Sequence, residues 1–415
     1  MSDRAGVGTR LFIQGGAHIG TALCSFATTL VIVHAAGTAG FGEISIGLSV
    51  LTYALMISNF GADLHATQVT AHNPAMFGSS MVAVMAIRLT VAIPVLAVIA
   101  VLCTMHFWEP VTRIAVGLLS LSVLINVLTP LWAAQALEQA KVIAASTFGA
   151  QAFNLLFVIL AAVMGWGILG FVLARVAADS LVAIGLSFWV KNQSRKGAPL
   201  HASLAFVRRF FFDSAPLAAS QILRTMALGS DLLILDFYVS PIAVGVYAVP
   251  FRIFMLLLSV TGIYTIVILP TFARRAADGG VALHQTLHQF LFVPFWVLVG
   301  GLALIAAATP FFLPRLFGPD FAPGSVSLQL LLVAVAANFL NRCYRCVILA
   351  SKQRVGDMNS TAIGTVANVG AKLILIPVLG IAGAACGMIF GEVVQCILQR
   401  RLAIKSIRAL EQSDN

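Results

Sequence analysis

Charge is what this sequence has least of: Asp, Glu, Lys and Arg make up 10% of its 415 residues, whereas hydrophobic residues make up 60%. Soluble domains carry about 25% charged residues, so this composition excludes a soluble protein and makes the lipid bilayer the solvent. Only helices and closed barrels cross a bilayer, because each backbone polar group needs an internal partner. Apolar runs such as LTVAIPVLAVIAVLC (89–103) and LILIPVLGIAGAACGMIF (373–390) are too long for barrel strands of about ten residues. The sequence therefore predicts an all-α integral membrane protein.

Other scarcities narrow the function. The formal net charge of +10 is typical of basic cytoplasmic loops in a membrane protein, so we expect no nucleic-acid partner. The six cysteines are scattered and indicate no disulfide framework, and the eight histidines form no HExxH pattern. We therefore expect no metal and no cofactor. The loops between apolar runs are too short for a catalytic domain, so we expect no catalytic residues and no enzyme activity. The leader MSDRAGVGTR predicts no cleavable signal peptide.

Apolar windows of about twenty residues predict twelve membrane-spanning helices. They lie near residues 11–34, 42–62, 79–103, 112–133, 142–164, 168–190, 213–236, 242–268, 286–309, 326–350, 358–378 and 381–403. An even number places both termini on one side of the membrane. With the N-terminus inside, sixteen basic residues fall on the inner side, and Arg113 and Arg315 alone fall on the outer side. The positive-inside rule thus predicts a multi-pass protein with both termini in the cytoplasm.

The chain contains an internal repeat. The stretch from Gln135 to Gly170 resembles the stretch from Leu349 to Gly383, and the matched residues keep one spacing as far as Asn154 and Asn368, after which one gap aligns Gly167 and Gly170 with Gly380 and Gly383. Each half holds six expected helices and starts on the same side, which predicts two six-helix bundles, 1–200 and 201–415, with a linker at 191–209. Transporters built from parallel repeats bind substrate between the halves. One stretch, GWGILG (165–170), matches the dinucleotide pattern GxGxxG, but no βαβ unit surrounds it, and we expect a turn between helices.

Charged residues within the expected helices are the candidate functional residues. An arginine at the bilayer centre costs about 2.5–3.5 kcal/mol even on the mildest scale, so these residues must face a wet cavity or pair with acids. The basic ones are Arg88, Arg175, Arg224, Arg252, Arg342, Arg345 and Lys372, and the acidic ones are Asp63, Asp179, Asp231, Asp236 and Glu392.

Position along the helices predicts which of these side chains can reach the lipid headgroups. Arg88, Arg224, Arg252 and Arg342 are expected at a depth from which they cannot reach the headgroups, whereas Arg345 is shallower. Lys372 is expected near the outer end of its helix, extending its amine to the interface.

Sequence spacing suggests partners for some of these charges. Arg175 and Asp179 are four residues apart and predict an intrahelical pair. Asp231 either tethers Arg224 or forms a separate ion site, and Glu392 is a candidate partner for an arginine of the helix expected at 326–350.

The surplus of deep cations favours an anionic substrate, because guanidinium groups suit phosphate oxygens. The alternative is that all of these charges are paired scaffold residues. We expect five arginines to bind an anionic headgroup in a cavity and three carboxylates to couple ions. The arginines are Arg252, Arg224, Arg88, Arg342 and Arg345, and the carboxylates are Asp63, Asp231 and Glu392. Cys343 and Cys346 form a lone CxxC without a partner pair, and we interpret them as small packing residues.

Several passages resemble a known family. They are AGTAGFGEISIGLSVLTYALMISNFGAD (36–63), VGVYAVPFRIFMLLLSV (244–260), LPTFARR (269–275), LFGPDFAPGSVSLQLL (316–331), LASKQ (349–353) and IPVLGIAGAACG (376–387). In this order they resemble the Wzx-type polysaccharide flippases of the multidrug/oligosaccharidyl-lipid/polysaccharide (MOP) exporter superfamily, over nearly the whole chain. Arg252 carries over by its position in the matching helix, whereas the other arginines depend on their depth.

The resemblance implies a MATE-like pair of bundles around a central cavity. It also implies a flippase of the bacterial inner membrane that moves an undecaprenyl-pyrophosphate-linked oligosaccharide outward for O-antigen (lipopolysaccharide), capsule or exopolysaccharide synthesis. The expected partners are this lipid-linked oligosaccharide, the bilayer, and polysaccharide polymerases or glycosyltransferases, and we expect a monomer. The alternatives are a MATE-type drug/cation antiporter, which predicts a cavity dominated by acids, and a membrane glycosyltransferase or polymerase, which predicts a large outer loop or a cluster of acids and histidines.

Overall fold

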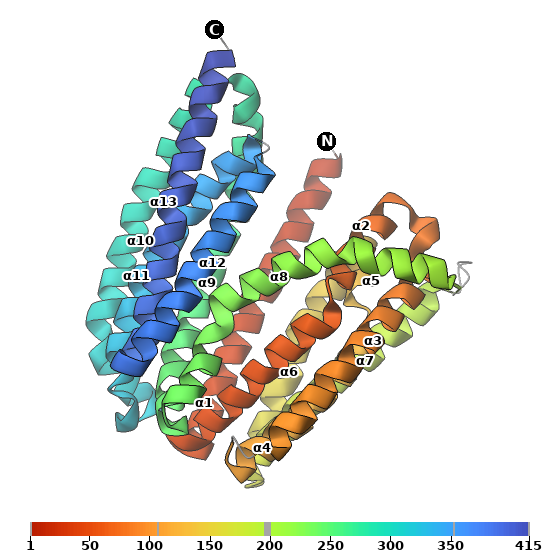
Figure 1. The fold of residues 1–415 in the computed structure, drawn as a ribbon, viewed down its shortest axis with the longest axis vertical. Coiled ribbons are helices and arrows are strands. Elements are labelled where there is room, and N and C mark those ends of the chain that lie inside the picture. Colours follow the sequence, from red (N-terminus) through yellow and green to blue (C-terminus); the bar gives the residue numbers. More distant parts are fainter. Residues whose placement is uncertain (1, 106–107, 195–200, 352, 414–415) are drawn as a thin grey trace. The chain divides into compact units, whose positions relative to one another are not determined.

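The computed structural model describes residues 2–105, 108–194, 201–351 and 353–413. Within these ranges every regular element is helical, which confirms the all-α prediction (Figure 1). The elements are α1 (Ser2–Asn59), α2 (Ala62–His72), η1 (Pro74–Met76), α3 (Phe77–Thr104), α4 (Pro110–Val127), α5 (Leu131–Ala136), α6 (Ala140–Val163), α7 (Gly167–Ser194), α8 (Leu204–Tyr238), α9 (Pro241–Arg275), η2 (Ala276–Asp278), α10 (Gly280–Phe317), η3 (Pro319–Phe321), α11 (Gly324–Ala350), α12 (Arg354–Leu379) and α13 (Ile381–Ser413).

Ten of the described helical segments are long and apolar enough to cross a membrane, and their mean hydropathy lies between 1.5 and 2.5. The first, Gln14–Asn59, has 46 residues and contains both spans predicted at 11–34 and 42–62. The two parts of α1 meet at Gly37, whose φ of 69° and ψ of −174° are not helical. The span predicted at 213–236 lies in α8, which is not among the ten. A multi-pass membrane protein is confirmed, whereas the count of twelve spans stays a prediction.

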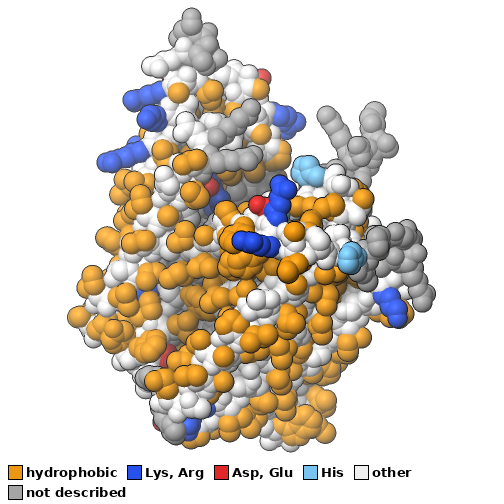
Figure 2. Space-filling view, turned by 45° about the vertical axis from the view of Figure 1, so that its right-hand side comes forward, with side chains coloured by type: hydrophobic (Ala, Val, Ile, Leu, Met, Phe, Trp, Pro, Cys, Tyr) orange, Lys and Arg blue, Asp and Glu red, His pale blue; other side chains and the backbone are white. Residues whose placement is uncertain are grey.

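Exposed apolar side chains support the same conclusion. The window of α10 that meets the spanning criteria has a mean hydropathy of 2.4, yet only 6% of it is buried. Exposed hydrophobic patches on soluble monomers rarely exceed a few hundred Å². An exposed helix as apolar as α10 therefore indicates contact with lipid. Hydrophobic side chains cover most of the face in Figure 2, and Lys and Arg side chains are few on it.

The chain forms two compact units, Met1–Thr225 and Met226–Asn415, and the boundary lies within α8. The predicted boundary at 200/201 adjoins residues 195–200, which lie outside the described residues, and it stays a prediction. In the first unit α1 packs against α3, α4 and α6, and α7 packs against α4 and α6. In the second unit α11 packs against α9, α10 and α13, and α12 lies beside α13.

Two helix breaks in the first unit expose backbone groups that side chains then bind. Between α1 and α2, Phe60 and Gly61 have φ values of 47° and 68°. A Cβ atom at Gly61 would lie 2.6 Å from the backbone N of Ala218, so only glycine lets α8 approach the break this closely. The second break separates α4 from α5 and ends at Pro130, which precedes α5. The chain thus has two breaks inside one bundle.

Glycine also sets the close packing of α13 against α12. Gly383, Gly387 and Gly391 recur every four residues and therefore share one face of α13. Cβ atoms at these positions would overlap α12 at Leu375, Lys372 and Asn368, respectively. Small residues at this spacing let two membrane helices approach to backbone contact.

The predicted turn within GWGILG is confirmed. Residues 164–166 connect α6 to α7, and Gly165 and Gly167 have φ values of 68° and 63°. These glycines allow the left-handed backbone that the short connection requires.

Candidate functional site

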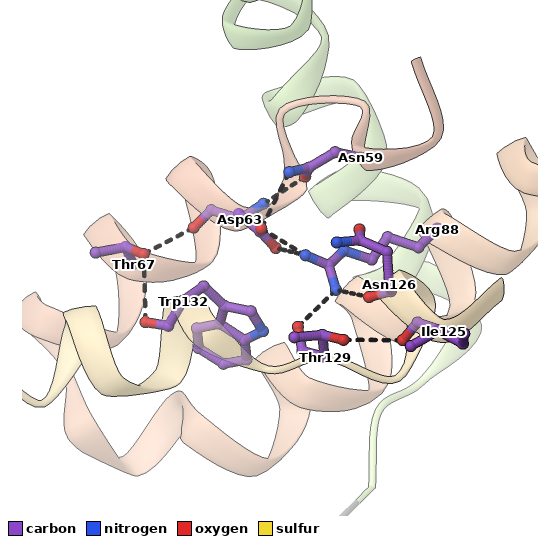
Figure 3. Close-up of polar contacts among 8 residues, drawn as sticks. All are labelled: Asn59, Asp63, Thr67, Arg88, Ile125, Asn126, Thr129 and Trp132. Carbon is purple, nitrogen blue, oxygen red and sulfur yellow. Dashed lines mark hydrogen bonds and ion pairs between the residues drawn. The ribbon is translucent and has the colours of Figure 1, made fainter. Parts of the chain in front are cut away.

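Arg88 is the centre of a buried polar network in the first unit. Its side chain is 3% exposed, and Nη2 forms an ion pair of 2.5 Å with Asp63, whose side chain is 23% exposed. Nη1 donates to the backbone carbonyls of Asn126 at 2.7 Å and Thr129 at 3.0 Å. Figure 3 shows Asp63 and Arg88 pointing toward each other, with Asn126 and Thr129 beside the guanidinium. One arginine of α3 thus contacts α2 and the end of α4.

The local sequence explains why this arginine lies here. Asp63 occupies the first turn of α2, where a negative charge opposes the positive end of the helix dipole. Asn126 and Thr129 lie at the end of α4, where carbonyls have lost their helical partners. Asn59 donates to Asp63 at 3.0 Å and accepts from its backbone N–H, which fixes the carboxylate. Arg88 therefore stabilises both helix breaks, through the carboxylate at one and the carbonyls of Asn126 and Thr129 at the other.

A second buried network lies in the second unit around Asp231. The ammonium of Lys372 pairs with Oδ1 of Asp231 and donates to Ser230 Oγ at 3.1 Å, and the Tyr247 hydroxyl donates to Oδ2 of Asp231. The side chains of Lys372 and Asp231 are both 0% exposed. The prediction that Lys372 extends to the interface is therefore wrong. Its position along α12 was compatible with that, but the side chain points into the bundle, where Asp231 and the close approach of α13 hold it.

A third network links Arg342 to Glu392 through an amide. Arg342 Nε donates to Asn338 Oδ1 at 2.7 Å, and Asn338 Nδ2 donates to both carboxylate oxygens of Glu392 at 3.0 and 3.1 Å. Asn341 Nδ2 adds a bond of 2.7 Å to Glu392. A Cβ atom at Gly262 would lie 3.3 Å from Arg342 Nη1, so α9 passes beside the guanidinium. The predicted link between Glu392 and an arginine of α11 thus runs through Asn338.

The other predicted cations differ in their surroundings. Arg345 Nε pairs with Asp357 at 3.0 Å, and its side chain is 39% exposed. Arg175 pairs with Asp179 at 3.0 Å, which confirms the intrahelical pair. Arg252 is half-buried in α9. Arg224 lies in α8, but its side chain is outside the described part of the structure.

Cys343 and Cys346 are buried in an apolar cluster with Phe272, Leu283 and Phe339. Both cysteines are free thiols. Across the described residues, no group of three His, Cys, Asp or Glu side chains is arranged to hold a metal ion. The interpretation of the CxxC pair as packing residues fits this environment.

Sequence reasoning missed the roles of Tyr247, Ser230 and Asn338. Asn338 lies one helical turn before Arg342, and this spacing in the sequence could have suggested the contact. The glycines at 383, 387 and 391 form a G-xxx-G-xxx-G pattern that indicates a close helix pair. That pattern could have suggested that a polar residue of α12 was buried against α13.

Comparisons with known proteins support a transporter fold. Residues 9–275 match a family described as "polysaccharide biosynthesis protein". The lipid II flippase MurJ, in an inward closed conformation, is similar with a TM-score of 0.72 at 10% identity, over 97% of this chain and 90% of that one. A MATE crystal structure has a TM-score of 0.64 at 16% identity, over 97% and 96% of the two chains. A MOP superfamily transporter from Pyrococcus furiosus, described as having a binding pocket of reverse polarity, has a TM-score of 0.60 at 16% identity, over 97% and 95%. No curated protein matches the sequence. At these identities the structural likeness establishes the fold alone.

Proposed function

The chain belongs to the polysaccharide biosynthesis protein family, and from this premise we propose that it flips an undecaprenyl-pyrophosphate-linked oligosaccharide across the bacterial inner membrane. The lipid tail stays in the bilayer while the pyrophosphate and sugars pass through a polar interior, and no covalent bond is made or broken. The product supplies O-antigen, capsule or exopolysaccharide synthesis. We further propose that the protein acts as a monomer with cytoplasmic termini, beside polymerases or glycosyltransferases that use or supply the lipid-linked sugar.

The observation that carries this proposal is a difference in exposure between cations and carboxylates. Asp231 and Glu392 are 0% and 6% exposed. Arg252 and Arg342 are half-buried, and Arg345 has a 39% exposed side chain. Lys372 is buried with Asp231, but these three arginines of α9 and α11 are more accessible than either carboxylate, which suits an anionic substrate. A drug/cation antiporter would need the opposite arrangement.

Depth strengthens the argument for Arg342. It lies eight residues before the end of α11 at Ala350, about 12 Å along the helix. A guanidinium facing lipid at such a depth costs about 2.5–3.5 kcal/mol, so a polar space that admits phosphate oxygens is the better account of its partial exposure. Arg252 and Arg342 are the proposed headgroup contacts, and Arg345, Arg224 and Arg88 stay predicted ones. Among these, Arg88 has its Nη groups on Asp63 and two carbonyls, and Arg345 is paired with Asp357.

The membrane potential has the right sign to drive outward movement of the pyrophosphate. A charge that crosses the membrane gains or loses about 2.3 kcal/mol per 100 mV, and a pyrophosphate leaving a negative cytoplasm moves in the favourable direction. If an ion is coupled as well, Asp63 is the best placed of the three predicted carboxylates. Its side chain is 23% exposed, whereas Asp231 and Glu392 are buried.

The proposal is tested in cells that depend on this protein for surface polysaccharide. Arg342→Gln and Arg252→Gln should each reduce export and cause lipid-linked oligosaccharide to accumulate on the cytoplasmic side. Arg175→Gln is the matched control, because it removes the same charge from a helix but from a cation paired with Asp179. Normal export by well-expressed Arg342→Gln and Arg252→Gln proteins would contradict the assigned headgroup contacts. If cells that lack the whole protein accumulate no lipid-linked sugar, the proposed function itself is contradicted.

A further inference from the structure

The carboxylate and hydroxyl groups around Asp231 are of the kind that bind a cation, and the cation they bind is the ammonium of Lys372. We propose that the Lys372 ammonium fills a monovalent-cation site in the second unit, so that this unit balances its buried charge without an ion from solution. The proposal goes beyond the flippase function and does not depend on it, because it concerns what holds α8, α9 and α12 together.

The oxygen atoms that the ammonium contacts come from α8, and α9 supplies a hydroxyl that holds the carboxylate from its other side. Ser230 Oγ and Asp231 Oδ1 of α8 accept from Lys372 Nζ, and Tyr247 of α9 donates to the other carboxylate oxygen. Tyr247, Asp231 and Lys372 are each 0% exposed, and Ser230 is 6% exposed. A carboxylate with neighbouring hydroxyl oxygens is the hard-oxygen environment that cations such as Na⁺ prefer. An ammonium can occupy the same place because it offers three donors around one positive charge.

Both oxygens of Asp231 are occupied by donors, one by Lys372 and the other by Tyr247. A buried charge without its partner costs several kcal/mol, so the site cannot release its cation cheaply. A tethered cation also loses no translational freedom at the site, in contrast to a free ion.

The α12–α13 contact keeps the lysine in this position. A Cβ atom at Gly387 would lie 2.5 Å from Lys372 Cγ, so α13 packs directly on the lysine stem. The stem therefore has no room to turn toward the membrane interface. The predicted role of Asp231 as an ion-coupling residue is accordingly replaced by a permanent pair.

The inference has a direct consequence for shorter side chains at position 372. Lys372→Ser removes the ammonium and most of the stem, and it leaves the carboxylate and hydroxyl oxygens around a vacated space. Na⁺ should then bind there and stabilise the variant. Lys372→Gln removes the charge but keeps most of the side-chain volume, so it fills the space and is a control that should not respond to sodium.

The experiment measures the melting temperature of purified protein in detergent, in sodium chloride and in choline chloride of equal ionic strength. The wild type should melt at the same temperature in both salts. Both variants should melt lower than wild type in choline, and sodium should raise the melting temperature of Lys372→Ser saturably, by about 3 °C at a concentration about 100 times Kd. The double variant Asp231→Asn/Lys372→Ser is the matched control, and it should not respond to sodium.

Two results would overturn the inference. One is a sodium-specific rise in the melting temperature of wild type, which would show that the unit still needs an ion from solution. This measurement needs no variant, so the inference stays refutable even if both substitutions prevent folding. The other is equal melting of a folded Lys372→Ser protein in both salts. Neither result bears on polysaccharide export, so the flippase proposal stands or falls separately.

Discussion

Replacement of Arg88 by alanine is the substitution that tests the first unit most sharply. Arg88→Ala removes the ion pair with Asp63 and the donors to the carbonyls of Asn126 and Thr129. The substitution therefore affects both helix breaks at once. It leaves a carboxylate that is 23% exposed without its cation, together with two carbonyls at the end of α4.

The expected cost follows from burial. Removing one partner of a fully buried ion pair typically destabilises a protein by about 3–5 kcal/mol, and the 23% exposure of Asp63 places the loss at the lower end of that range. The two carbonyls add to that cost wherever water does not reach them. Arg175→Ala is the matched control in the same unit, since its pair with Asp179 spans one helical turn with side chains 30% and 19% exposed. Such a pair contributes about 0.5 kcal/mol.

The assay is equilibrium unfolding of both purified variants in detergent micelles by a denaturant titration. We expect Arg88→Ala to lose at least about 2 kcal/mol more than Arg175→Ala, which is the difference between a buried pair and an intrahelical one. Losses that agree within about 1 kcal/mol, the scale of an ordinary exposed pair, would refute the claim that Arg88 stabilises the two breaks.

The remaining predictions concern a helix break, the CxxC pair and one histidine. Gly61→Ala should be far more destabilising than Gly165→Ala in thermal unfolding, because both have a φ of 68° but only Gly61 lies against the α8 backbone; equal losses would show that backbone strain alone matters. The double variant Cys343→Ala/Cys346→Ala should keep its export activity and lose only about 1–2 kcal/mol of packing, and loss of export in a well-folded double variant would contradict the packing role. Burial lowers the pKa of His65 from 6.5, so the folded protein binds fewer protons than the unfolded chain, and stability should fall as pH falls through 6.5. His65→Asn should flatten that dependence of the melting temperature on pH; an unchanged slope would assign it to other groups.

Local patterns in the sequence predicted local structure well. The helical class follows from apolar runs that no barrel strand could contain, and the Arg175–Asp179 pair follows from a spacing of four residues on one helix. The turn at Gly165 follows from glycines between two apolar segments. In each case the interacting groups lie close together in the chain, so the periodicity of the helix is enough to place them.

Partners far apart in the sequence could not be predicted in this way. Lys372 and Asp231 are 141 residues apart, and Arg88 and Asp63 are 25 residues apart on different helices. Hydropathy gives the depth of a side chain but not the face of the helix that carries it. Depth alone therefore predicted that the Lys372 side chain extends to the interface, whereas the packing of α13 on α12 directs that side chain into the bundle.

The same limit applies to the proposed headgroup contacts. The sequence places Arg252 and Arg342 deep in apolar helices, but it does not predict that Asn338 bonds to both Arg342 and Glu392. The amide of Asn338 accepts from the arginine and donates to the carboxylate, and so orients both groups. The surplus of cations that favoured an anionic substrate is thus smaller than the sequence alone suggests, since Arg88, Arg175, Arg345 and Lys372 each contact a carboxylate.

The central claim is transport of a lipid-linked oligosaccharide, and translocation by purified protein tests it most directly. Vesicles would carry an undecaprenyl-pyrophosphate-linked sugar, with and without the protein, and a membrane-impermeant glycosidase would be added outside. The account predicts that the protein makes inner-leaflet substrate accessible to the enzyme, and that Arg342→Gln slows this while Arg175→Gln does not. Substrate that stays protected in vesicles containing folded wild-type protein, under an applied membrane potential of either sign, would contradict the account.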